Sequence, residues 1–168
     1  MSYLLVGLGN PGEKYKKTRH NAGKMFIRWI NEGRRTKDKG RRNFDAIESE
    51  CFMNESGGWI KNDLRFTIYD LRNLFIIHDD LDIPLGKFKI QFGKGPRLHK
   101  GVSSVEQALG TKEFGRVRIG VDARTKAEGR RPKDEGEDYV LERFTAGERK
   151  TLEAIFPAIL DKIKQLII

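Results

Sequence analysis

A histidine near the amino terminus and a run of carboxylates in the middle of the chain are the residues best suited to acid–base chemistry. His20 lies in the segment Thr18–Asn21, and the run His78-Asp79-Asp80-Leu81-Asp82 places three carboxylates within four residues. Crowded carboxylates repel one another unless something uses them. They can bind a divalent cation, as in nucleases, or one can orient an imidazole that then activates water. Residue types alone do not choose between these uses, and a lone histidine is most often a surface residue or a helix cap.

Other polar side chains next to expected turns and helix starts are candidates for the same site. The run Gly7-Leu8-Gly9-Asn10-Pro11-Gly12 has the spacing of a dinucleotide-binding loop, but Pro11 removes an N–H donor and no helix opens within the glycines. A tight turn that presents Asn10 is the better interpretation. Asn54 precedes an expected helix, where it can cap the helix or donate to an anionic oxygen. His99-Lys100 precedes another helix and indicates an anion-binding helix start.

The apolar pattern predicts strands that alternate with helices. Expected strands are Tyr3–Leu8, Ala46–Cys51, Leu74–His78, Phe88–Phe92 and Val117–Val121. Expected helices are Asn21–Ile30, Asn54 to about Tyr69, one containing Val102, Val105 and Leu109, and a closing helix that follows a Thr145–Glu148 capping box and kinks at Pro157. Gly33–Asn43 is expected to be an exposed basic loop. The alternation predicts one α/β domain over residues 1–168, with a mainly parallel sheet covered on both faces. The carboxylates then lie where the central strand ends, at the edge that binds ligands in such sheets.

The charge is strongly positive and unevenly placed. The 33 Lys and Arg residues exceed the 24 acidic residues, which gives a formal net charge of +9. Basic residues gather in Lys14–Arg42, Lys87–Lys100 and Arg116–Lys133. Any one block is explained equally well by a solvated face, but three blocks together favour a polyanionic partner such as RNA or DNA.

Composition also limits the location of the protein. No apolar run approaches the roughly 20 residues of a membrane span, and the N-terminal apolar run is too short for a signal peptide. Cys51 is the single cysteine, so an internal disulfide is impossible. We therefore expect a cytoplasmic protein without a membrane partner.

In combination and order, these motifs resemble bacterial peptidyl-tRNA hydrolases. The matching segments are YLLVGLGNPGEKYKKTRHNAG, CFMNESGG, LFIIHDDLDIPLGKFKI, LHKG, RVRIGV and YVLERFTAGERKTL. The resemblance implies hydrolysis of the ester that joins a peptide to the 3′ end of tRNA, without a metal or another cofactor. It also implies a single α/β domain with a mixed, mostly parallel, twisted sheet between helices, acting as a monomer on peptidyl-tRNA.

The resemblance also implies roles for individual residues. His20 matches the catalytic base and Asp79 the carboxylate that orients it, while Asn10 and Asn54 match asparagines that line the site. The substrate-binding positions are Tyr15, Met53, Asn54, His99 and Lys100. Lys89 and Arg118 match a basic pair that holds a tRNA phosphate.

Two departures from the family pattern keep other functions open. The family usually has asparagine where this chain has Lys100, and its glycine-rich loop is replaced by Gly93-Lys94-Gly95-Pro96-Arg97. Lys100 can stabilise an oxyanion, bind a phosphate or lower the pKa of His20. The alternatives to the hydrolase are an RNA-binding relative without turnover and a metal-dependent nuclease that uses Asp79, Asp80 and Asp82.

Overall fold

A five-stranded sheet forms the centre of the computed structural model, which describes residues 3–37, 43–62, 70–124 and 133–167. The strands lie in the order β2-β1-β3-β5-β4. Their bounds are β1 (Tyr3–Gly7), β2 (Phe44–Glu48), β3 (Leu74–Pro84), β4 (Phe88–Phe92) and β5 (Gly115–Asp122). All neighbouring pairs are parallel except β4 with β5, which is antiparallel. The prediction of a mixed, mostly parallel sheet is therefore confirmed.

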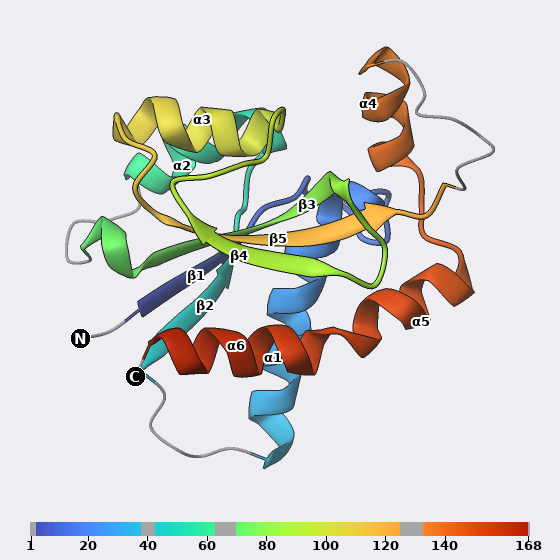
Figure 1. Ribbon diagram of the computed structural model, residues 1–168, viewed down its shortest axis with the longest axis horizontal. Helices are drawn as coiled ribbons and strands as arrows, with labels where there is room; N and C mark the ends of the chain where they lie inside the picture. Colours follow the sequence, from blue (N-terminus) through green and yellow to red (C-terminus); the bar gives the residue numbers. More distant parts are fainter. Residues whose placement is uncertain (1–2, 38–42, 63–69, 125–132, 168) are drawn as a thin grey trace.

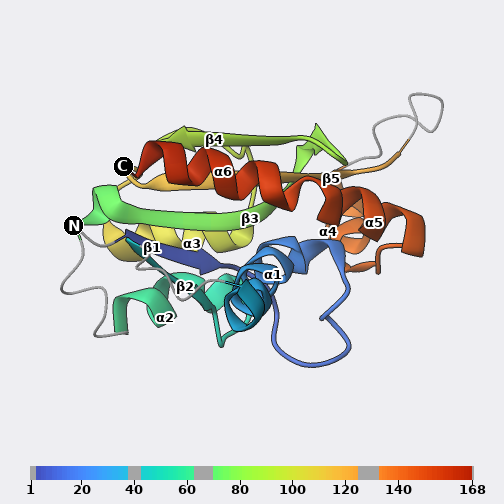
Figure 2. The ribbon, with the colours of Figure 1, turned by 90° about the horizontal axis from the view of Figure 1, so that it is seen from below.

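Helices cover both faces of the sheet. They are α1 (Ala22–Lys37), α2 (Ser56–Asn62), α3 (Lys100–Leu109), α4 (Lys133–Leu141), α5 (Ala146–Ala154) and α6 (Phe156–Leu166), with the short 3₁₀ turns η1 (Arg19–Asn21), η2 (Met53–Glu55) and η4 (Leu71–Asn73). Figure 1 shows α2 and α3 on one face and α1 and α6 on the other. In the view from below, α6 crosses the β3–β4 side of the sheet and α1 covers the β1–β2 side (Figure 2).

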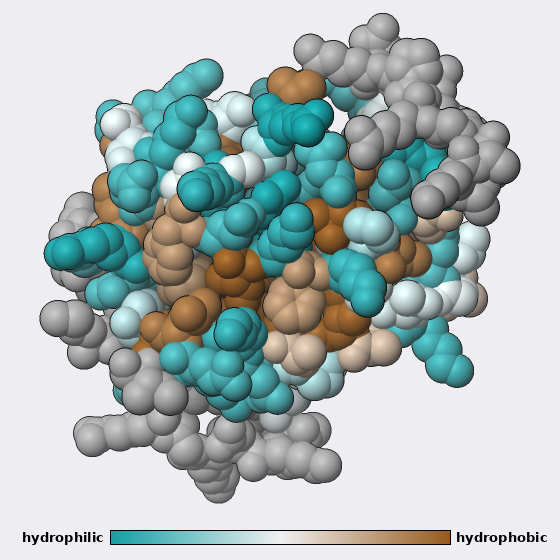
Figure 3. Space-filling model, in the orientation of Figure 1, coloured by the Kyte–Doolittle hydropathy of each residue, from teal (hydrophilic) through white to brown (hydrophobic). Residues whose placement is uncertain are grey.

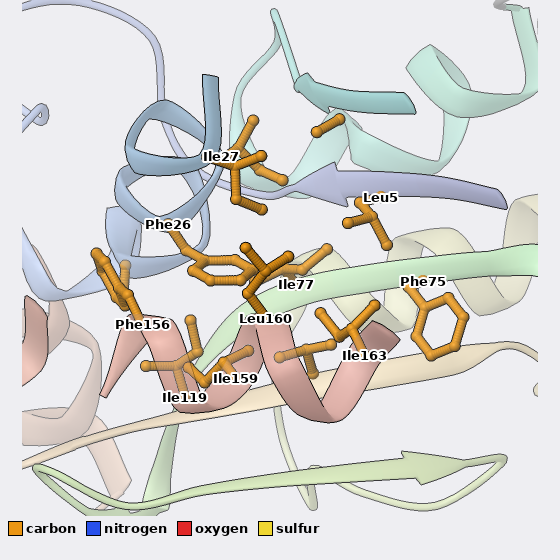
Figure 4. Packing of buried hydrophobic residues seen from close by; sticks show 14 of the residues in the cluster. Leu5, Phe26, Ile27, Phe75, Ile77, Ile119, Phe156, Ile159, Leu160 and Ile163 are labelled. Atoms are coloured by element: carbon orange, nitrogen blue, oxygen red, sulfur yellow. The ribbon is translucent and has the colours of Figure 1, made fainter. Parts of the chain in front are cut away.

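Two apolar clusters hold these layers together. Between the sheet and the pair α1–α6, the rings of Phe26 and Phe156 pack edge to face with centroids 5.3 Å apart, next to Ile77 and Ile119 (Figure 4). The other cluster joins α2 and α3 to the opposite face; its fully buried members include Leu4, Val6, Ile60, Ile76 and Val105. Successive strand residues point to opposite faces, so strands covered on both sides must be apolar throughout. This explains the uninterrupted apolar runs in β1 and in the first half of β3.

The central strand is longer than its apolar pattern predicts. The sequence predicts an end at His78, but β3 continues to Pro84, and Asp79 and Asp80 pair with Ile119 and Gly120 of β5. The prediction that the carboxylates follow the strand is therefore wrong. The two buried acids fit inside this strand because Asp79 contacts two imidazoles and Asp80 pairs with Arg118, while Asp82 is exposed.

Other boundaries also differ from the prediction. α1 extends to Lys37 through part of the expected basic loop, because that segment contains ordinary helix formers apart from Gly33. β2 begins at Phe44 rather than Ala46. In the described residues, the expected helix after Asn54 consists of η2 followed by α2 (Ser56–Asn62). Residues 38–42 of the loop and 63–69 of that helix lie outside the described residues.

The last third of the chain contains one helix that the sequence did not reveal. α4 has only a weak apolar stripe, and Figure 1 shows it beyond the carboxyl end of β5. The capping box is confirmed: Thr145 N donates to Glu148 Oε2 at 2.7 Å, and Glu148 N donates to Thr145 Oγ1 at 3.2 Å. The closing helix is divided into α5 and α6 at Ile155, because Pro157 lacks the N–H that would continue α5.

The surface agrees with this layering. On the face shown in Figure 3, hydrophilic residues cover α3, while apolar surface gathers at the level of the edge strand β4, where Phe92 is 43% exposed.

Within the described part of the chain, no helix is both long and apolar enough to cross a lipid bilayer.

The start of α1 approaches the sheet so closely that only glycine fits at position 23. A Cβ on Gly23 would overlap the carbonyl oxygen of Ile77 in β3. We expect Gly23→Ala to push α1 from the sheet and lower the free energy of unfolding by about 2 kcal/mol, measured by urea denaturation. Gly33→Ala in the same helix is the matched control, since a Cβ there meets no atom of the described residues within 4 Å. The control should raise stability slightly. Equal effects of the two substitutions would contradict this packing.

Candidate active site

Asp79 is a buried carboxylate shared by two imidazoles. His20 Nδ1 lies 2.9 Å from Asp79 Oδ1 and 3.0 Å from Oδ2, and His99 Nε2 lies 2.8 Å from Oδ1. The exposed fractions of the side chains are 12% for His20, 4% for His99 and 2% for Asp79. Three segments meet here: η1 carries His20, β3 carries Asp79, and His99 is the N-cap of α3. The predicted meeting of His20 and Asp79 is therefore present.

The hydrogen bonds assign the tautomers of both imidazoles. His99 Nδ1 accepts from Val102 N at 3.2 Å, so its Nε2 carries the proton that it donates to Asp79. His20 Nδ1 donates to the same carboxylate, which leaves the Nε2 of His20 as the basic nitrogen. This Nε2 has no hydrogen bond within the described residues. It is also not one of their fully buried, unpartnered polar atoms, so it reaches solvent. A base that opens to solvent, with its other nitrogen fixed, is the arrangement needed to activate water.

Asp79 makes His20 more basic. Burial lowers the pKa of His20, but the charge and hydrogen bond of Asp79 outweigh burial and raise it above the usual 6.5. Burial also raises the pKa of Asp79, yet the two imidazoles overcome it and hold the pKa far below the usual range. Asp79 is therefore ionised whenever the protein is folded near neutral pH.

His78 supports this centre and stays neutral. Its Nδ1 donates to the backbone oxygen of Asp79 at 2.7 Å, and its ring meets that of His99 edge to face with centroids 4.8 Å apart. The side chain is fully buried, and burial lowers its pKa to about 3. No role was predicted for His78 beyond its place in the strand.

Asn10 is held in place by an asparagine that the sequence analysis did not single out. Asn21 is fully buried; its Oδ1 accepts from Asn10 N at 2.8 Å and its Nδ2 donates to Asn10 O at 2.9 Å. Asn10 Oδ1 accepts from Met53 N at 2.8 Å. Its amide nitrogen is thereby left without a hydrogen bond in the described residues and is available to a ligand. The only signal for Asn21 was its position next to His20.

Asn54 and the expected substrate neighbours lie around this centre. Met53 is buried. Its sulfur lies so close to Gly101 that a Cβ on this glycine would overlap it, so η2 packs directly on the start of α3 beside His99. Asn54 is the next residue and is exposed. Tyr15 is half-buried, and its ring meets that of Phe52 edge to face with centroids 6.4 Å apart. The structure thus brings Asn10, Met53 and His99 together, with Asn54 adjacent and Tyr15 beside Phe52.

Arg19 and Glu137 are two further residues near the site that the sequence analysis missed. The buried Arg19 guanidinium stacks on the Tyr139 ring of α4 at 4.1 Å and binds Glu142 at 3.2 Å and Glu148 at 3.0 Å. Arg19 therefore ties η1 to α4 and α5. Lys100 Nζ pairs with Glu137 Oε2 of α4 at 2.9 Å. The contacts with Tyr139 and Glu137 were not predicted, because α4 itself was not predicted.

The two residues of the expected phosphate-binding pair differ in exposure and in their hydrogen bonds. Lys89 and Arg118 are cross-strand neighbours in β4 and β5. Lys89 is exposed, whereas Arg118 Nε donates to Asp80 Oδ2 at 2.7 Å and its Nη1 donates to Gln91 Oε1 at 2.6 Å. Asp80 also accepts from Asp82 N at 2.8 Å. Arg118 is thus engaged within the protein, and Lys89 faces solvent.

The carboxylates do not gather into a metal-binding cluster among the described residues. His20, Asp79 and His99 each offer one atom, and these lie within 4.8 Å of one another. Both imidazoles already donate protons to Asp79, so an ion would have to displace those protons. Asp80 is bound to Arg118, and Asp82 is exposed. The geometry therefore uses these residues as hydrogen-bond partners.

The buried neutral His78 should make the fold sensitive to acid. As the pH falls below 6.5, the unfolded chain protonates this histidine and the folded chain does not, so stability falls toward pH 3. Asp79, with its lowered pKa, adds a further loss of stability below about pH 4. His20, with its raised pKa, changes stability only above about pH 6.5, where its contribution is lost as the pH rises. We expect His78→Asn, which keeps a donor for Asp79 O, to reduce the slope of unfolding free energy by up to about 1.4 kcal/mol per pH unit. Urea unfolding between pH 7 and 4 measures it; an unchanged slope would contradict the neutral assignment.

The chain resembles known proteins over nearly its whole length. A family model described as peptidyl-tRNA hydrolase matches residues 4–168. The peptidyl-tRNA hydrolase of Geobacter metallireducens is 36% identical over 178 residues, which cover 98% of this chain and 88% of that protein. The peptidyl-tRNA hydrolase of Mycobacterium marinum is 35% identical over 179 residues, which cover 98% of this chain and 90% of that protein.

Solved structures of the same kind share the fold. The crystal structure of a peptidyl-tRNA hydrolase in complex with N-propanol gives a TM-score of 0.83 at 26% identity, covering 99% of this chain and 88% of that chain. The crystal structure of peptidyl-tRNA hydrolase from Acinetobacter baumannii gives 0.82 at 25% identity with the same coverage. Sequence and fold therefore agree that the chain belongs to the peptidyl-tRNA hydrolase family.

Proposed function

We propose that the chain hydrolyses the ester bond between peptide and tRNA in peptidyl-tRNA, with His20 as the general base. The observation that carries this proposal is the pair of His20 and Asp79, because it fixes one imidazole nitrogen and opens the other to solvent. An ester needs an attacking water, a base and donors for the oxyanion, and a site of this kind supplies them without a cofactor. The leaving group is a ribose hydroxyl, so no covalent nucleophile is needed and Cys51 takes no part.

The proposed steps use the described side chains alone. His20 Nε2 accepts a proton from water as the water oxygen attacks the ester carbonyl. Asp79 stabilises the imidazolium that forms, and the proton then passes to the leaving ribose oxygen. The amides of Asn10 and Asn54 donate to substrate oxygens; one such donor contributes on the order of 3 kcal/mol.

The remaining residues bind or position substrate in this proposal. His99 has both ring nitrogens engaged, so we assign it to holding Asp79. Tyr15, Met53 and Lys100 line the approach of the peptide and the terminal nucleotide. Lys89, with the unused N–H groups of Arg118, contacts a tRNA phosphate.

Three further expectations belong to the proposal. The enzyme acts as a monomer, as one domain over residues 1–168, and in the cytoplasm. The match of a single family model to residues 4–168 supports the single domain. The free thiol of Cys51 suits a reducing compartment.

Removal of the base tests the function directly. Wild-type protein should release free tRNA from N-acetyl-aminoacyl-tRNA, and His20→Ala should lower the rate roughly 10²- to 10⁴-fold, because positioned proton transfer contributes this much. The wild-type rate should rise with pH through a pKa above 6.5, since only neutral His20 accepts a proton. Acid gel electrophoresis of the tRNA measures the release.

Chelation separates the alternatives in the same assay. The hydrolase should be indifferent to EDTA and leave the RNA chain whole. Cleavage of the chain that EDTA abolishes would support the nuclease instead. Binding of the substrate without turnover would support an RNA-binding relative.

Alanine substitutions of the two candidate phosphate contacts should differ in their effect on stability. Lys89→Ala should weaken tRNA binding and reduce the salt slope of the affinity by about one, with unchanged stability, because Lys89 is exposed. Arg118→Ala should also lower the thermal midpoint, because it leaves the buried carboxylate of Asp80 unpaired. Filter binding at several salt concentrations and thermal melts measure the two effects. A salt slope unchanged by Lys89→Ala would remove Lys89 from the interface.

A further inference from the structure

An exposed ion pair joins the start of α3 to α4 beside the catalytic base. Lys100 Nζ lies 2.9 Å from Glu137 Oε2, and the two side chains are 63% and 65% exposed. Exposed pairs contribute little to stability, because water screens both charges and ordering long side chains costs entropy. Any role of this pair therefore follows from its position near His20 rather than from its contribution to stability.

Lys100 directly follows His99, and the ring centroids of His99 and His20 are 5.1 Å apart, so the ion pair lies beside His20. The titratable groups that face His20 from the described elements are Asp79 on β3, His99 and Lys100 at the start of α3, and Glu137 on α4. Lys24 of α1 is directed elsewhere, to the backbone oxygen of Ser49 at 2.6 Å. Lys100 is thus a cation close to a residue that has to accept a proton, and Glu137 is the acid that meets it.

We propose that Glu137 is a positioning residue for the catalytic base: it pairs with Lys100 and keeps this cation from opposing proton transfer to His20. The inference rests on the proposed function of His20. Opposite charges 2.9 Å apart act at a distance as a dipole, so their combined effect on His20 is much smaller than that of either charge alone.

Packing of α4 keeps Glu137 in reach of Lys100. Tyr139, two residues further along α4, is buried, and the Arg19 guanidinium stacks on its ring. Arg19 also donates to the backbone oxygen of Tyr139 at 3.4 Å and pairs with Glu142. Arg19, the residue before His20, therefore fixes the helix that carries Glu137. The same side chain thus positions both the base and the acid that pairs with Lys100.

The pKa directions agree with the geometry. Lys100 lowers the pKa of His20, and Glu137 raises it. Glu137→Gln leaves the cation uncompensated, so the pKa of His20 should fall. Lys100→Asn leaves the carboxylate uncompensated, so the pKa should rise. The double variant Lys100→Asn/Glu137→Gln removes both charges and should return close to the wild-type value.

The test is this set of three variants, measured in two ways. The pKa of His20 is followed by NMR titration of its Cε1–H, and the acidic limb of the pH–rate profile is followed with N-acetyl-aminoacyl-tRNA. We expect single-variant shifts of roughly 0.3 pH unit in opposite directions at low ionic strength. They should shrink near 0.15 M salt, where the Debye length is about 8 Å. Glu153→Gln is the matched control: it removes one acid from the exposed Arg149–Glu153 pair and should leave the pKa unchanged.

The NMR measurement needs no turnover, so it separates this inference from the proposed function. Shifts of equal sign in the two single variants, no shift in either, or an equal shift in Glu153→Gln would overturn the inference even if the enzyme is active. Opposite shifts that cancel in the double variant would support the inference, whereas an active His20→Ala variant would overturn the proposed function and the inference with it.

Discussion

The buried charge of Asp79 is the constraint on which the site depends. An ionised carboxylate that is 2% exposed is costly by several kcal/mol unless other groups satisfy it. Two imidazoles do so, and they come from segments 59 and 20 residues away in the chain. The sheet must therefore bring η1 and the start of α3 to one point on β3 before this charge is tolerable. The contacts that make the buried charge tolerable in the folded protein are therefore the same contacts that orient His20.

Several features of the fold serve that meeting point. Gly23 lets α1 begin against β3, so that η1, just before it, reaches Asp79. Asn21 fixes the loop after β1 and with it Asn10, and Asn10 in turn fixes η2 through Met53 N. These contacts join the loop after β1 to η1 and to η2, and η2 in turn packs on the start of α3. The polar network therefore adds directional contacts to the apolar packing of the layers.

Local patterns predicted most of this fold, and long-range electrostatics account for what they missed. Apolar runs located all five strands, and the Thr145–Glu148 spacing located the start of α5. The carboxylates of β3 were placed after the strand, because an acid inside a strand looks unfavourable until its distant partner is known. α4 was missed because its contacts come through Arg19 and Glu137 rather than through an apolar stripe. In the site, motif resemblance named His20, Asp79 and Asn10, while Asn21, Arg19 and Glu137 act through other residues and leave no spacing signal.

Neighbouring carboxylates on one strand have separate tasks because strand residues alternate between faces. Asp79 meets the imidazoles, and Asp80, which points to the other side of β3, binds Arg118 and, through it, Gln91 of β4. Because the two aspartates are adjacent in the chain, His20 and Arg118 contact neighbouring residues of β3. Removal of Arg118 from Asp80 would leave a buried carboxylate unpaired, so Arg118 is held in place, whereas its cross-strand neighbour Lys89 is exposed. A single strand thereby carries both the carboxylate that contacts His20 and the carboxylate that contacts Arg118.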